Sequence, residues 1–195
     1  MAVQDSLFSP LEDVDFVGHL LVDLHDDLPG KVARFRQLAD LSADLGSYAS
    51  MLTGGRVAYS AWVEARSSFV HGNFVATVLL CQALAEHMLA SQLAIGIHGQ
   101  ELPARIDFRE TLKRSLKAGV ITDAHADELR KLMELRNPLS HYRGAGDASN
   151  LFRRAVDTRT DPAEHLLGDA TFAVSVAVRL LALPAFRVDR SSLDD

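Results

Sequence analysis

The stretch NFVATVLLCQALAEHMLASQLAIGI, residues 73–97, is the longest apolar run in the chain and decides the class of fold. Its apolar residues follow helical spacing, so we predict one long helix, closed by Gly96 and Gly99. Glu86 and His87 interrupt the run, whereas a membrane-spanning helix needs about 20 nearly uninterrupted apolar residues. The stretch therefore predicts a buried helix of a soluble protein.

The segments on either side also carry apolar residues at helical spacing. We predict a first helix that ends at Pro29-Gly30 and a second that begins at Lys31, because proline and glycine interrupt helices. The other predicted helices span residues 56–70, 104–117, 122–136 and 162–183, with a polar loop over residues 144–161. The residues expected to face inward from the first two helices are Phe16, Leu20, Leu21, Leu24, Leu28, Phe35, Leu38, Leu41, Leu45 and Tyr48.

Together these helices predict an all-α protein. A length of 195 residues is typical of one domain. We expect residues 56–185 to form a helical bundle, residues 1–55 an N-terminal helical layer packed on it, and residues 186–195 a flexible tail. Cys81 is the only cysteine, and the first residues show no signal-like apolar run. Both observations predict a cytoplasmic protein.

Charge is unevenly distributed along the sequence. The net charge of −6 argues against a surface coated by nucleic acid, but residues 103–159 hold 12 Lys or Arg against 8 Asp or Glu. One basic segment in an acidic chain is compatible with a local polyanion site, and also with chance. The sequence contains no HExxH, GxxxxGKS/T, GxGxxG or GxSxG motif, and its histidines lack metal-ligand spacing. We predict no metal and no cofactor.

The segment ELRNPLSHYR, residues 134–143, is the strongest candidate for a chemical site. Proline disfavours the helical conformation of the residue before it, so we expect the preceding helix to end near Arg136 and Asn137. Asn137 would then cap a new helical turn that begins with Pro138. The resulting kink would turn Arg136 and His141 toward one point. The alternative is an ordinary helix stop, in which these residues have no chemical role.

An arginine and a histidine that share a pocket can act together on RNA. A guanidinium binds phosphate oxygens in a fork and stays charged at physiological pH. An imidazole titrates near neutrality, so His141 could take the proton of a ribose 2′-hydroxyl while Arg136 stabilises the phosphorane. The products would be a cyclic phosphate and a free 5′-hydroxyl, without a metal. A symmetric dimer would bring the second histidine that acid–base cleavage usually needs.

Three stretches together resemble the HEPN superfamily (higher eukaryote and prokaryote nucleotide-binding domains). LRNPLSHYR is similar to its R-x4-6-H signature, GNFVATVLLCQALAEHML to its long helix with one internal glutamate, and DATFAVSVAVRLL to its closing helix. The resemblance covers residues 60–185, roughly, and leaves residues 1–55 outside. It implies a helical bundle, usually a dimer with both motifs at the interface. Many members are metal-independent endoribonucleases of toxin–antitoxin and other defence systems, whereas others are non-catalytic binding or assembly modules.

Position by position, Arg136 and His141 match the family's catalytic pair, and Asn137 matches the polar residue that often follows the arginine. In toxins paired with a nucleotidyltransferase antitoxin, a tyrosine two places beyond the histidine receives AMP. Here Tyr142 lies directly beside the histidine, and Arg143 occupies the place of that tyrosine. The resemblance therefore gives no support for AMP-type control.

Six further residues are candidates for supporting roles. Arg105, Arg109 and Lys113 recur every four residues, so they share one helix face. We interpret this face as a stripe that binds the RNA backbone; a solvated face is the alternative. The carboxylate of Glu86 lies in an apolar helix and needs a partner, and Arg136 is one candidate. The substrate-binding candidates are Arg105, Arg109, Lys113 and Arg143, and the candidates for orienting the catalytic groups are Glu86 and Tyr142.

The sequence thus leads to two hypotheses of different classes. The first is a homodimeric, metal-independent endoribonuclease of the toxin or defence type, with Arg136, Asn137 and His141 in its site. The second is a non-catalytic helical dimer that binds a nucleotide, RNA or a protein partner. An antitoxin or another protein partner fits either hypothesis, and no membrane association is expected.

Overall fold

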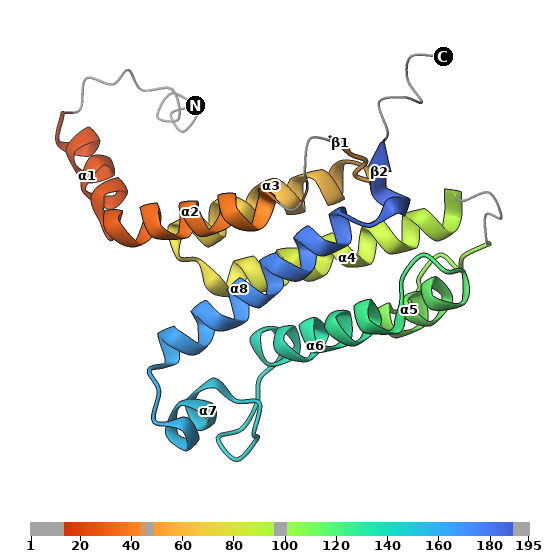
Figure 1. Cartoon of the computed structure of the whole chain (residues 1–195). Helices are drawn as coiled ribbons and strands as arrows, with labels where there is room; N and C mark the ends of the chain where they lie inside the picture. The colour runs from red at the N-terminus through yellow and green to blue at the C-terminus, as the bar shows by residue number, and fades with distance from the viewer. Residues whose placement is uncertain (1–13, 44, 46–48, 96–100, 189–195) are drawn as a thin grey trace, which may run out of the picture.

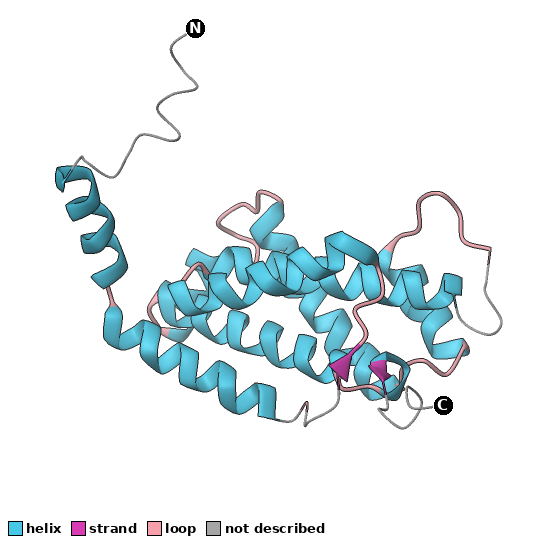
Figure 2. Ribbon diagram, turned by 90° about the horizontal axis from the view of Figure 1, so that it is seen from above, coloured by secondary structure: helices cyan, strands magenta, loops and turns pink. Residues whose placement is uncertain are grey.

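The computed structural model describes residues 14–43, 45, 49–95 and 101–188. Over these residues the protein is all-α, as the sequence predicts, with one short pair of strands (Figures 1 and 2). The helices are α1 (Val14–His25), α2 (Leu28–Ala43), α3 (Gly55–His71), α4 (Phe74–Ile95), α5 (Phe108–Lys117), α6 (Asp123–Ser140), α7 (Leu151–Thr158) and α8 (Pro162–Leu181). A 3-10 turn, Pro184–Phe186, follows, and the strands are β1 (Ala49–Ser50) and β2 (Arg187–Val188).

Helix α4 lies at the centre of the bundle. It packs against α3, α5, α6 and α8, so apolar residues around its whole circumference find neighbours (Figure 1). Val78, Cys81 and Met88 are fully buried along it, which confirms the prediction of a buried helix. Among the described helices, α4 is also the one long and apolar enough to cross a membrane by length and composition.

The strand pair joins the start of α3 to the end of α8. Strand β1 pairs antiparallel with β2, and Ser50 lies opposite Arg187. Phe186, the last residue of the 3-10 turn, is fully buried beside this pair. The predicted flexible tail from residue 186 is therefore wrong for residues 186–188, because a buried aromatic ring and backbone hydrogen bonds hold them. Residues 189–195 of that predicted tail lie outside the described residues.

The boundary between the first two helices also differs from the prediction. Helix α1 ends at His25, and Pro29 lies in the first turn of α2, where its missing N–H interrupts no hydrogen bond. The chain turns at Asp27, which has a φ of 48°. A Cβ at Gly30 would clash with the Asp27 carboxylate, so a larger residue there would displace this side chain.

Only part of the predicted N-terminal layer packs on the bundle. Helix α2 packs on α3 and α8 and buries Leu38, whereas α1 extends away from the bundle (Figures 1 and 2). The prediction that α1 faces inward is therefore wrong, because Leu20, Leu21 and Leu24 remain about half exposed. Phe35 is also exposed, whereas Leu41 and Leu45 pack against the core as predicted. Tyr48 and the side chain of Phe16 lie outside the described residues.

The predicted polar loop over residues 144–161 contains a helix, α7. The Asn150 side chain accepts hydrogen bonds from the first N–H groups of this helix and donates one to the Arg143 carbonyl oxygen at 2.8 Å. From α7, Arg154 forms a two-pronged ion pair with Asp169 of α8, with N···O distances of 2.6 and 2.9 Å. Apolar periodicity missed α7 because charged groups anchor it to the bundle.

Candidate functional site

Helix α6 continues through Pro138 and ends at Ser140, so the predicted helix end near Arg136 and Asn137, with a new turn capped by Asn137, is wrong. Proline removes only the hydrogen bond to the carbonyl four residues earlier, which belongs to Glu134, an exposed residue whose carbonyl water can satisfy. The last turn is supported by Ser140, whose hydroxyl donates to the Arg136 and Asn137 carbonyl oxygens, both at 3.3 Å. The chain leaves the helix only at residue 141.

This continuous helix separates the environments of Arg136 and His141. Arg136 and Asn137 are partly buried and line a cleft, whereas His141 is exposed and is not part of the cleft lining. The backbone of His141 is extended, with φ −132° and ψ 135°, because this residue caps the C-terminal end of α6. The structure thus brings Arg136 and Asn137 together, and places His141 beyond the end of the same helix.

The cleft lies between α4, the segment at the start of α5, and α6, and has a volume of about 550 Å³. We call it the arginine cleft, after Arg105, Arg109 and Arg136. Five of its lining residues are candidates from the sequence, and a sixth polar residue, Gln82, was not predicted. The sequence signal that could have identified Gln82 is its position on α4, one turn before Glu86 in an otherwise apolar helix. These six residues are Gln82, Glu86, Arg105, Arg109, Arg136 and Asn137.

The start of α5 fixes two of the three arginines. The helix begins at Phe108, later than predicted, because the Asp107 side chain caps it and accepts the Glu110 N–H at 2.8 Å. Phe108 is buried and anchors the turn, so Arg105 and Arg109 project from either side of this cap. The N-terminal end of α5 therefore adds the positive end of its helix dipole to the cleft.

The cleft carries more positive than negative groups. Its lining holds three arginines and two carboxylates, Glu86 and Asp107, and Asp107 already caps α5. None of the ion pairs between described residues involves Arg105, Arg109 or Arg136. Three guanidinium groups without a carboxylate partner, at one cleft, form an arrangement suited to an anion.

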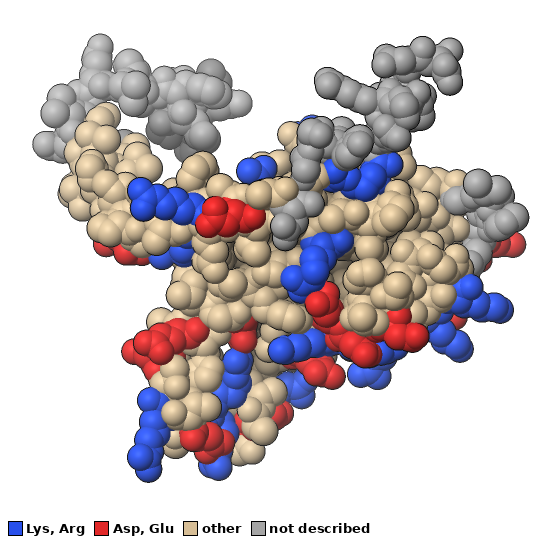
Figure 3. All heavy atoms as spheres, in the orientation of Figure 1, with Lys and Arg blue, Asp and Glu red and all other residues tan. Residues whose placement is uncertain are grey.

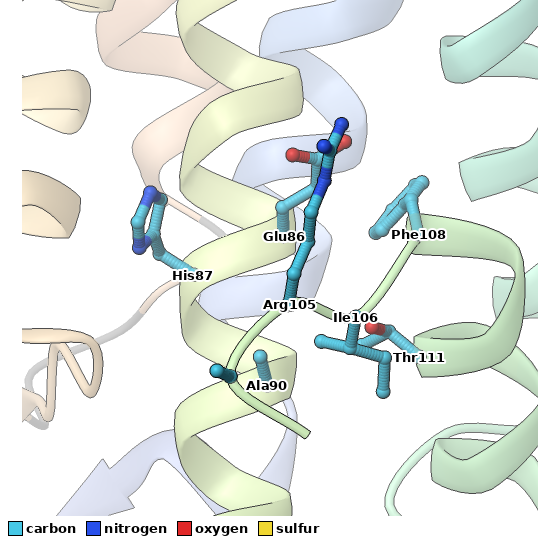
Figure 4. A pocket seen from close by; sticks show the side chains of 8 residues that line it. Glu86, His87, Ala90, Arg105, Ile106, Phe108 and Thr111 are labelled. Carbon is cyan, nitrogen blue, oxygen red and sulfur yellow. The ribbon is translucent and has the colours of Figure 1, made fainter. Parts of the chain in front are cut away.

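Glu86 is held by a neighbour on its own helix. The Gln82 Nε2 atom donates a hydrogen bond to Glu86 Oε1 at 2.9 Å, so the suggested pairing of Glu86 with Arg136 is replaced by a pairing with Gln82. Figure 4 shows Glu86 and Arg105 extending in the same direction, while His87 points away on the other side of α4. A smaller cavity of about 260 Å³, also lined by Glu86 and Arg105, adjoins the cleft.

The remaining predicted site residues do not line the arginine cleft. Lys113 is 82% exposed and its Nζ lies 4.0 Å from a Glu110 carboxylate oxygen, as the solvated-face alternative predicts. Tyr142 is 94% exposed. Arg143 Nε lies 3.9 Å from Asp147 Oδ2. Hydrogen bonds from Ser149 lower the pKa of Asp147, and the charge of Arg143 lowers it further.

The surface around the cleft is of mixed charge. On the face shown in Figure 3, basic and acidic side chains alternate along the lower edge of the molecule and form no continuous basic face. Among the described residues, no group of three or more His, Cys, Asp or Glu side chains is placed to hold a metal ion. No protein-family model, curated protein or solved structure matches the chain.

Proposed function

We propose that the arginine cleft binds the phosphate group of a nucleotide or of RNA. The observation that carries this proposal is a set of three arginines, two at the start of α5 and one on α6, that line one cleft without an ion-pair partner among the described residues. A volume of about 550 Å³ is in the range of small-molecule sites. Burial of a guanidinium without a carboxylate is unfavourable, and a phosphate supplies the missing negative charge.

The three arginines differ in burial, so they would contact a bound phosphate in different ways. Arg136 is partly buried, so it is the residue whose charge a bound phosphate compensates most strongly. Arg105 and Arg109 are exposed and flank the cap of α5, where they can close on the ligand from the solvent side. The Asn137 amide, beside Arg136, can donate a hydrogen bond to a phosphate or ribose oxygen.

Binding is tested by replacing Arg136 and, as a matched control, an arginine of the same helix outside the cleft. Arg136→Gln should weaken the binding of a labelled oligoribonucleotide about tenfold or more, because a charge-assisted contact to phosphate is lost. Arg130→Gln, which removes only an exposed ion pair with Asp127, should leave affinity unchanged. Fluorescence anisotropy measures both. Equal loss in the two variants, or in neither, contradicts a specific role for the cleft.

A second candidate function is metal-independent RNA cleavage by the same end of α6. His141 is exposed and lies five positions after Arg136, and the resemblance to the HEPN superfamily supports this function. An RNA held by its phosphate in the cleft would have to extend past Ser140 before a 2′-hydroxyl could reach the imidazole. A twofold-related copy would bring the second histidine.

Cleavage is tested on labelled RNA in the presence of EDTA. If the protein is a nuclease, the wild type yields fragments with cyclic phosphate ends, and His141→Ala abolishes them because the proton acceptor is lost. His71→Ala, which removes an exposed histidine at the end of α3, serves as the control for a nonspecific effect of losing an imidazole. RNA that stays intact at high protein concentration, while anisotropy reports binding, leaves the non-catalytic module as the function.

A further inference from the structure

The arginine cleft also presents a hydrogen-bond acceptor that a phosphate does not use. Gln82 is only 2% exposed, and its Nε2 donates to Glu86 Oε1. A carboxylate accepts and does not donate at neutral pH, so the amide orientation is fixed by chemistry. The Gln82 Oε1 atom is left buried without a hydrogen-bond partner among the residues that the structure describes.

A buried acceptor without a partner is unusual and unfavourable. The acceptor that the cleft offers to a ligand is Glu86 Oε2, which takes part in no hydrogen bond within the described residues. The cleft thus combines donors, from the three arginines, with an acceptor, from Glu86, that Gln82 holds in place. Inorganic phosphate would engage the donors alone. A complete fit needs a ligand with an anionic group and neighbouring N–H groups.

Among the common nucleobases, guanine meets this requirement best. It has two adjacent donors on its Watson–Crick edge, the ring N1–H and the 2-amino group. Adenine and cytosine place one amino group beside a ring acceptor, and uracil has one N–H between two acceptors, so each would set an acceptor against the oxygens of the cleft. A carboxylate can accept both guanine donors at once.

We propose that Gln82 and Glu86 make the arginine cleft selective for guanine nucleotides, as free ligands or as a guanosine within RNA. This inference rests on the proposed phosphate binding and names its ligand. The Glu86 carboxylate accepts from N1–H and the 2-amino group, and the Gln82 amide, which donates to Glu86 Oε1, holds that carboxylate in place. Sites that hydrogen-bond a ligand group reject analogues that lack it, because the polar groups of the site are then left unpaired.

Calorimetric titration of the full chain with GMP, IMP and AMP provides the test. The wild type should bind GMP about tenfold or more tightly than AMP, with IMP in between because it keeps N1–H and lacks the 2-amino group. Glu86→Gln keeps an oxygen for the Gln82 amide but presents an amino group to the base. It should abolish the preference for GMP and favour AMP, whose ring N1 accepts a hydrogen bond.

Gln82→Met tests the hold on Glu86, since methionine has a similar volume and cannot donate to the Glu86 carboxylate. It should reduce the ratio of GMP to AMP affinity, and its thermal unfolding shows whether the variant is folded. If it is unfolded, the wild-type series and Glu86→Gln decide. Equal affinity of the wild type for GMP and AMP overturns the selectivity but leaves phosphate binding standing. Absence of binding to all three nucleotides and to the oligoribonucleotide overturns both.

Discussion

Arg136 shows how far single residues can be interpreted from sequence. The sequence singled out Arg136, Asn137 and Glu86, and the structure places all three in the lining of one cleft. The expected proximity of His141 depended on a break at Pro138, and the helix contains no such break. Side-chain type can be read from a sequence, whereas the direction in which a helix presents that side chain depends on the exact residue at which it ends.

The buried thiol of Cys81 should make the stability of the protein depend on pH in the alkaline range. Complete burial raises the pKa of its thiol from 9.0 to about 12, because the interior disfavours the thiolate. Between these two values the unfolded chain releases the proton and the folded chain keeps it, so stability is full below pH 9 and falls as the pH rises further. At pH 10.5 the loss should be about 2 kcal/mol.

Urea unfolding of the wild type and of Cys81→Ala at pH 8 and pH 10.5 measures this loss. The variant has no thiol and should lose less stability over the same interval, although both proteins share the titration of their other groups. Parallel losses in the two proteins would show that Cys81 ionises equally in the folded and unfolded states, and would contradict its enclosure.

At the scale of elements, two prolines occupy different positions in their helices, and the sequence rules for proline predict only one of them correctly. Pro162 opens α8, where proline is favourable, whereas Pro138 lies inside α6. Local sequence rules predicted the first and failed at the second, because the packing of Leu132 and Leu129 into the core holds α6 together beyond its proline. Apolar periodicity did not predict α7 either, because this helix is held by an ion pair with Asp169, a residue of another helix.

Pro138→Ala is therefore expected to stabilise the protein by about 1 kcal/mol. The alanine N–H can donate to the Glu134 carbonyl, and the clash of the proline ring with the preceding turn disappears. Pro162→Ala, at the first position of α8, should instead leave stability unchanged or lower it slightly. Thermal and urea denaturation measure both changes. A destabilised Pro138→Ala would indicate that α6 ends before the proline, as the sequence alone suggested.

At the scale of the whole molecule, the class of fold followed from apolar periodicity and the N-terminal arrangement did not. Twelve residues of α1 form an amphipathic helix, which periodicity identifies, but periodicity does not say whether its apolar face meets the same bundle. Leu20, Leu21 and Leu24 remain exposed on it, so α1 receives little of the stabilisation that tertiary packing gives the other helices. Only the layer formed by α2 belongs to the packed body.

The pairing of β1 with β2 has a consequence for how the protein is made. Ser50 and Arg187, which it brings together, are separated by 137 positions. A ribosome adds about 5–20 residues per second, so the early strand waits several seconds for its partner. Helices α3 to α6 can begin to associate in that interval, but the pairing of β1 with β2 can form only after residue 188 has left the ribosome.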